Sequence, residues 1–202
     1  MLRRQGYTLV EVMTGVAIVG ILAAAMVPNV GSYLRSRGSA NGSGQLGAHL
    51  RLARSCAVME GNDYVVQFVD DSHYRVLDDD GGGDGVPGSD AYVAANRGNG
   101  RADNGERVLG LFTLPAEVVF ASVAGARNPF TGKPVSAAVT FPERNGRPTL
   151  VFHANGTAED GGFVALSPRA DLQSTHGGRC RVLQVLRLTG GIESRSATRQ
   201  GS

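Results

Sequence analysis

The sequence predicts an α+β fold in which an N-terminal helix continues into a second helical segment packed on an antiparallel β-sheet body. Three observations carry this prediction: a long apolar segment near the start, a short stretch of helical periodicity after it, and a series of short apolar runs separated by turn residues. With 202 residues, 42% of them apolar, the chain has room for one modest globular domain and an accessory segment.

The N-terminal segment has the composition of a membrane helix. It follows a short basic stretch, Met1 to Gly6, and from Tyr7 to Val27 its only ionisable group besides the Tyr7 phenol is Glu11. As a helix this segment is roughly 31 Å long, about the thickness of the hydrocarbon core of a bilayer. Arg3 and Arg4 favour a cytoplasmic leader, so the rest of the chain is expected to be exported.

Three interpretations of this segment compete. One is a secretory signal peptide that is cut after Ala25, and another is a plain signal anchor. Both leave Glu11 unexplained, because a carboxylate in an apolar membrane helix is costly and is functional by default. The third interpretation gives this carboxylate a function.

The string from Gly6 to Val12, GYTLVEV, resembles the processing site of type IV pilins and type II secretion pseudopilins. This resemblance implies that residues 1–6 are a prepilin leader and that prepilin peptidase cuts between Gly6 and Tyr7 and methylates the new N-terminus. Glu11 and Pro28 then match that family's acidic residue and its helix-breaking proline. The implied assembly helix covers residues 7–34.

Elementary electrostatics supports a function for Glu11 in assembly. A lone amine and a lone carboxylate are each expensive in lipid, but the α-amine of one subunit can neutralise the carboxylate of its neighbour inside a filament. Pro28 removes a backbone hydrogen bond and clashes with the preceding turn, so we expect a kink or a break between Ala24 and Pro28.

The segment 35–44 has the composition of a flexible Gly/Ser linker. After it, Leu46, Leu50, Ala53 and Ala57 recur at helical spacing, which predicts an amphipathic helix that ends near Gly61.

The body, residues 45–202, is predicted to be β-rich. Eight strands are expected, and turn signals such as Asn145-Gly146 separate several of them. The predicted strands are Tyr64 to Val69, His73 to Leu77, Val108 to Phe112, Val118 to Val123, Ala137 to Phe141, Thr149 to His153, Phe163 to Ser167 and Arg181 to Thr189.

The passage from Leu50 to Ala57 and on to the strand at Val65, together with Phe152 to Gly156 and Val182 to Arg195, resembles the GspH/FimT group of minor pseudopilins and minor pilins. The resemblance implies a pilin-like fold and a minor pseudopilin of a type II secretion system. It further implies a single-pass inner-membrane helix, a periplasmic body, and partnership with prepilin peptidase and other filament subunits. The alternative is a FimT-like minor pilin of a type IV pilus, in pilus assembly or DNA uptake.

DNA binding is one consequence of that alternative, because some minor pilins of the FimT kind bind DNA through arginines near the C-terminus. Arg187, Arg195 and Arg199 are the candidates here, with phosphate contacts that make binding weaken with salt. Glu193 interrupts this stripe, so we expect no DNA binding.

Other candidate sites are few. Cys56 and Cys180 could form a disulfide in the periplasm, although a buried free cysteine is equally common. Asn99, Asp103 and Glu106 partly match a calcium loop, but Ala95 and Arg97 stand where two oxygen ligands are needed. We therefore expect a structural loop and no metal or other cofactor.

No catalytic constellation is present in the sequence. The histidines His49, His73, His153 and His176 stand in separate segments without paired spacing, and no serine lies in a nucleophile-elbow pattern. The chain is therefore expected to be a structural subunit and not an enzyme.

Overall fold

A computed structural model describes residues 8–82, 93–173 and 179–199, without the side chains of 25–36 and 198–199. The chain divides into two compact units, Met1–Arg37 and Gly38–Ser202. The predicted leader 1–6, Tyr7 and His176 lie outside the described residues.

A single long helix, α1, spans Leu9–Glu60 and so contributes to both units. A kink or a break is predicted between Ala24 and Pro28. The helix runs through Pro28 without interruption, so the break is wrong, and the kink stays a prediction. Among the residues that the structure describes, no helix combines the length and the apolarity needed to cross a membrane.

The predicted Gly/Ser linker at 35–44 is also wrong, because α1 passes through it without interruption. The small residues serve close packing instead. A Cβ at Gly42 would lie 3.2 Å from Cγ1 of Val118, and Ser39 and Ser43 are both buried. Ser43 satisfies its hydroxyl by donating to the carbonyl of Ala40, 3.0 Å away. The second unit therefore begins at Gly38, earlier than the predicted boundary at residue 45.

The predicted amphipathic helix is confirmed as the C-terminal part of α1. Leu46, Leu50, Ala53 and Ala57 are all fully buried. The helix ends at Glu60, and Gly61 follows with a φ of 71°. Its amide donates to the carbonyl of Ala57 at 3.0 Å, as in a left-handed C-terminal cap.

The first sheet contains five antiparallel strands in the order β3-β2-β1-β7-β6. Alternating residues of β1 point to opposite faces, since Tyr64, Val66 and Phe68 join the core against α1 while Val65 joins a smaller cluster on the other face. The strands are β1 (Asp63–Phe68), β2 (His73–Asp79), β3 (Val108–Thr113), β6 (Glu143–Arg144) and β7 (Arg147–Phe152).

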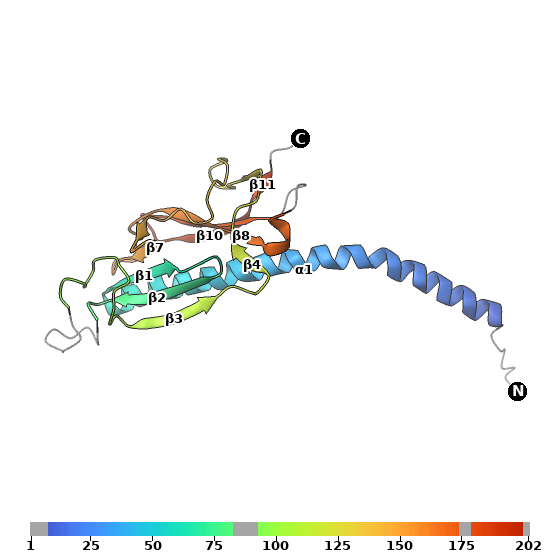
Figure 1. Ribbon diagram of the computed structural model, residues 1–202, viewed down its shortest axis with the longest axis horizontal. Coiled ribbons are helices and arrows are strands. Elements are labelled where there is room, and N and C mark those ends of the chain that lie inside the picture. The colour runs from blue at the N-terminus through green and yellow to red at the C-terminus, as the bar shows by residue number, and fades with distance from the viewer. Residues whose placement is uncertain (1–7, 83–92, 174–178, 200–202) are drawn as a thin grey trace, which may run out of the picture. The chain divides into compact units, whose positions relative to one another are not determined.

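The second sheet contains four antiparallel strands in the order β10-β9-β8-β4. Figure 1 labels β4, β8 and β10 of this sheet. A small third sheet pairs β11 with β5. The strands are β4 (Val118–Phe120), β5 (Ala126–Arg127), β8 (Gly162–Pro168), β9 (Arg181–Val185), β10 (Ile192–Ser196) and β11 (Thr198–Arg199), and a short 3₁₀ helix, η1 (Arg169–Asp171), follows β8.

The inner strands of the second sheet, β8 and β9, are buried on both faces, whereas β10 is largely exposed. Val164 and Leu183 contribute to the core that α1 shares with both sheets, whereas Ala165 and Val182 contribute to a second core with Val135 and its neighbours. This explains why the sequences of β8 and β9 are nearly continuously apolar and do not alternate between apolar and polar residues.

Three predicted strands differ from the structure. The one predicted from Val118 to Val123 is formed only over Val118–Phe120, as β4. The segment Ala137 to Phe141 is not a strand and makes one isolated bridge, between Val139 and Val164, while Phe141 turns into the core. The predicted strand from Arg181 to Thr189 stops at Val185, because the chain turns there and returns as β10. The predicted α+β, pilin-like fold, a helix packed on antiparallel sheets, is confirmed.

Candidate functional site

The first turn of α1 positions Glu11, the acidic residue singled out from the sequence. The Glu11 amide lies 3.3 Å from the hydroxyl oxygen of Thr8, and the Val12 amide donates to the Thr8 carbonyl at 3.2 Å. Thr8 thus caps the helix, and a carboxylate in the first turn interacts favourably with the helix dipole. The Glu11 side chain is exposed.

Large apolar side chains surround Glu11 and are exposed on every side of the helix. A helix that is apolar all round is stable in water only when a partner or lipid covers it. Between Thr8 and Ala24 the sequence offers no other charge. The exposed side chains are those of Leu9, Val10, Val12, Met13, Val16, Ile18, Val19, Ile21 and Leu22.

The two cysteines are both free thiols, so the predicted disulfide is not formed. They belong to different cores: Cys56 packs against the core between α1 and the sheets, and Cys180 lies in the second core with Val182. Burial raises the pKa of both thiols, which disfavours the reactive thiolate.

The three arginines proposed for DNA binding are spread over different elements. Arg187 is exposed in the turn between β9 and β10. Arg195 lies on β10, where its Nη2 is 3.3 Å from an Oε2 of Glu193 and its guanidinium is 4.8 Å from the centre of the Phe130 ring. Arg199 is on β11, and its side chain lies outside the described residues. The structure therefore gives Arg195 partners within the chain.

The described histidines have structural partners. The His49 ring nitrogen Nδ1 is 2.8 Å from the Tyr74 hydroxyl oxygen, and burial lowers its pKa. His73 pairs with Asp70 and His153 with Asp63, each at 2.8 Å. No two of these three share a partner, so they form no catalytic array.

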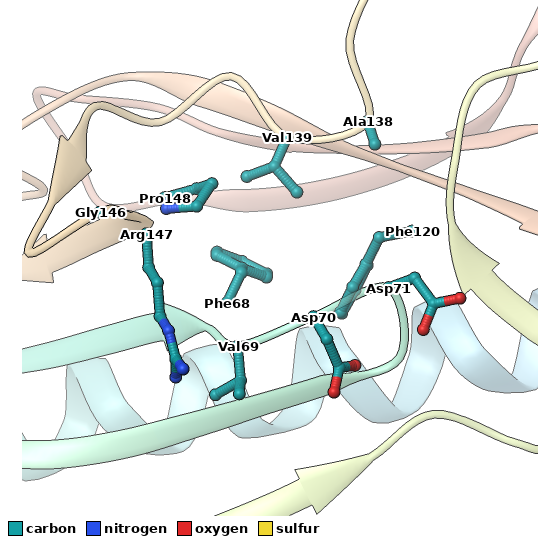
Figure 2. A pocket seen from close by; sticks show the side chains of 10 residues that line it. All are labelled: Phe68, Val69, Asp70, Asp71, Phe120, Ala138, Val139, Gly146, Arg147 and Pro148. Atoms are coloured by element: carbon teal, nitrogen blue, oxygen red, sulfur yellow. The ribbon is translucent and has the colours of Figure 1, made fainter.

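The body carries a groove of about 360 Å³ that sequence reasoning missed. Figure 2 shows Phe68 between the side chain of Arg147 on one side and Phe120 on the other, where Asp70 and Asp71 form an acidic end. Phe68 meets the Phe120 ring edge to face, with the ring centres 5.3 Å apart. Four separate segments meet here, so no local motif could have revealed the groove.

The acidic end of the groove stays charged. Hydrogen bonds from the Ser72 amide and from His73 hold the pKa of Asp70 at about 2, and Arg169 pairs with Asp71 at 3.0 Å. The groove therefore combines an apolar floor with fixed charges, which suits an apolar side chain that carries polar neighbours.

Comparison with known families decides the class of protein. Residues 43–189 match the family described as Type II transport protein GspH. The chain belongs to the GspH family. Residues 1–27 match the prokaryotic N-terminal methylation motif, and no curated protein matches the chain.

One solved structure, the minor pseudopilin EpsH from the type II secretion system of Vibrio cholerae, is similar to the chain. The two are 12% identical, with a TM-score of 0.45, and the match covers 78% of this chain and 96% of EpsH.

Membership of the GspH family agrees with the function predicted from the sequence, a minor pseudopilin of a type II secretion system. The family consists of structural subunits, and it implies assembly with other pseudopilins and a membrane-anchored subunit of a periplasmic filament.

Proposed function

We propose that this GspH-family chain enters the pseudopilus by a processed, methylated N-terminus. Cleavage between Gly6 and Tyr7 by prepilin peptidase frees the α-amine of Tyr7, which is then methylated. The methylation motif over residues 1–27 supports this proposal. The helix after Tyr7 lies in the inner membrane as a single pass, and the body from Gly38 onward lies in the periplasm as a structural, non-enzymatic subunit.

Glu11 directs assembly in this proposal. Its carboxylate is the only charge among the exposed apolar side chains of the first helical turns. Burial among neighbouring helices is unfavourable for this carboxylate unless a cation is supplied. The N-terminal amine of an adjacent subunit is such a cation, so it selects both the partner and the register. This lone carboxylate is the observation on which the proposal depends.

The mass of the mature N-terminus tests the processing step. We expect a chain that begins at Tyr7 with one added methyl group. A mature chain that begins at Met26 would show that a signal peptidase released the body, and it would overturn the proposal.

Variants of Glu11 test the pairing step. Glu11→Ala is expected to be processed normally but to enter filaments at a small fraction of the wild-type amount, and Glu11→Asp is expected to restore much of it. Glu143→Ala, an exposed carboxylate on β6, is the matched control and should assemble normally. Normal assembly of Glu11→Ala would refute the charge pairing.

A secretion assay separates the two filament systems. Deletion of the gene is expected to reduce export of type II substrates and to leave pilus-dependent motility unchanged. The opposite result would identify the chain as a minor pilin of a type IV pilus.

A further inference from the structure

Two buried carboxyl groups lie where a loop of the body covers strand β2. Asp79, on β2, bonds to the loop, whereas Glu106 belongs to the loop itself. The loop, residues 93–107, leads into β3. The Asp79 Oδ2 atom accepts a hydrogen bond from the Gly100 amide at 2.6 Å, and Glu106 Oε2 accepts one from the Asp103 amide at 2.9 Å. We call the Asp79 and Glu106 carboxyl groups, with these two amides, the acid latch.

The second oxygen of each carboxyl group has no partner. Asp79 is 1% exposed and Glu106 is 6% exposed. Within the part of the chain that the structure describes, Asp79 Oδ1 and Glu106 Oε1 are buried without a hydrogen-bond partner. Both forms of such a carboxyl group lose hydration without full compensation, but the penalty is much larger for the ionised form than for the protonated one.

The charges around the acid latch add to this disadvantage. Asp80 on the chain after β2 and Asp103 in the loop act on Glu106 as like charges, and Asp63 on β1 acts on Asp79 in the same way.

The nearby cations have other partners. Arg107 pairs with Glu60 and Asp78, and His153 pairs with Asp63. Arg144 on β6 pairs with Glu159 and donates to the Gly100 carbonyl at 3.0 Å. None of these contacts involves an oxygen of the acid latch. Loop amides, that of Gly100 at Asp79 and that of Asp103 at Glu106, favour the ionised carboxylates. Burial, with the like charges nearby, outweighs them and raises the pKa of both carboxyl groups.

Calcium is the competing ligand for the acid latch. Among the described residues, no group of three or more His, Cys, Asp or Glu side chains is arranged to hold a metal ion. The calcium-loop positions Asn99 and Asp103 bond to each other, with the Asn99 amide nitrogen 2.6 Å from Asp103 Oδ2. A proton neutralises a buried carboxylate without any further ligand, so protonation is the step that the proposal uses, and calcium is tested beside it.

We propose that the acid latch is a pH-sensitive clasp, which keeps the loop 93–107 on the outer face of the first sheet while its carboxyl groups are protonated and releases the loop when both ionise. The loop has something to cover, since Ala102 packs on a buried cluster of Val65, Leu77 and Val151. Release would expose this cluster on the face of the sheet opposite α1.

Burial sets the pH range of the clasp. Burial raises the pKa of Glu106 to about 8 and that of Asp79 to about 6, against ordinary values of 4.5 and 3.8. The folded state therefore binds these protons more tightly than the unfolded state. The stabilisation of the folded loop is complete at a pH below the ordinary pKa values and is lost as the pH rises through the raised pKa values. For Glu106 this loss takes place between pH 4.5 and about 8.

Hydrogen exchange of the full chain in detergent micelles, at several pH values, tests the clasp. Between about pH 6 and about pH 8 the opening equilibrium of the Gly98 and Gly100 amides should grow up to about tenfold per pH unit beyond the intrinsic rate change, and it should level off above about pH 8. Amides of β9 should show no such extra increase. Loop protection that does not depend on pH would overturn the proposal.

Variants assign the effect to its residue. In Glu106→Gln the extra pH dependence of loop exchange should be largely lost, while Glu117→Gln, an exposed site after β3, should keep it. Retention of the full effect in Glu106→Gln would overturn the proposal. If Glu106→Gln does not fold, the single variant Asp79→Asn replaces it. This variant is expected to weaken the extra pH dependence of loop exchange, and an unchanged pH dependence would overturn the proposal.

A parallel experiment with calcium distinguishes neutralisation of the carboxyl groups by protons from neutralisation by a metal cation. The wild-type experiment at about pH 9 is repeated with millimolar calcium chloride. Unchanged loop exchange supports the clasp, and restored protection would show that the acid latch is a cation site instead.

Discussion

The two ends of helix α1 have opposite surfaces. Near its start, Leu9 and Ile21 are 77% and 71% exposed, whereas Leu46 and Leu50 near its end are fully buried. The buried end owes its stability to the sheets that it packs on, and the exposed end has no such partner among the described residues of its own unit. Substitutions in the two regions should therefore be detected by different experiments, one on folding and one on assembly.

The largest effect is expected from Leu50→Ala. Removing this fully buried side chain leaves a cavity between α1 and the sheets, which should lower the free energy of unfolding by about 2–5 kcal/mol. Urea unfolding of the full chain in detergent micelles measures it. Leu22→Ala, at an exposed site on the same helix, is the matched control and should leave the transition of the body unchanged. A similar loss from both variants would erase the distinction between the two ends.

Arg107→Ala should have the next largest effect. Arg107 Nη2 lies 2.7 Å from Asp78 Oδ2 and pairs with Glu60 at the end of α1. Its removal leaves Asp78 buried without its cation, so we expect a loss of about 2 kcal/mol in unfolding free energy. The double variant with Asp78→Asn should recover part of this loss. Full additivity in the double-mutant cycle would argue against the pair.

Two glycine substitutions within α1 test whether residues 35–44 form a packed helix and not a flexible linker. Gly42→Leu should destabilise the body by about 1–3 kcal/mol through overpacking against Val118. Gly44 has no atom within 4 Å of an added Cβ, so Gly44→Ala should instead stabilise it by up to about 1 kcal/mol. Thermal unfolding monitored by circular dichroism distinguishes the two, and equal effects would favour a loosely packed linker.

The smallest effect is expected from a reductant. Both cysteines are free thiols, so dithiothreitol should leave the melting temperature unchanged. A disulfide would contribute about 2–4 kcal/mol, and its reduction would lower the melting temperature by several degrees.

Local pattern predicted much of the body. Tyr64 to Val69 and His73 to Leu77 were placed within two residues of β1 and β2, because turn residues separate two runs of strand-forming residues. The stretch around Gly42 was assigned to a linker because composition reflects intrinsic propensity, and tertiary packing outweighs that propensity here. The strand at Arg181 was extended too far since Leu186 and Leu188 continue the apolar run as exposed turn residues.

Some candidate sites, like some strands, could be predicted from local sequence, and others could not. Glu11 could be found from the sequence because a charge in an apolar helix stands out locally. The groove at Phe68 and the acid latch at Asp79 could not, since each depends on segments that only the fold brings together.

The position of β9 in the second sheet restricts when the body can fold. This strand, Arg181–Val185, pairs on one side with β8 and on the other with β10, and it contributes Leu183 to the core under α1. A polypeptide that emerges N-terminus first cannot complete this core until almost its last residues are available. If the body is translocated as proposed, most of it crosses the membrane before its core is complete. Until β9 pairs, the open edge of β8 needs protection from aggregation.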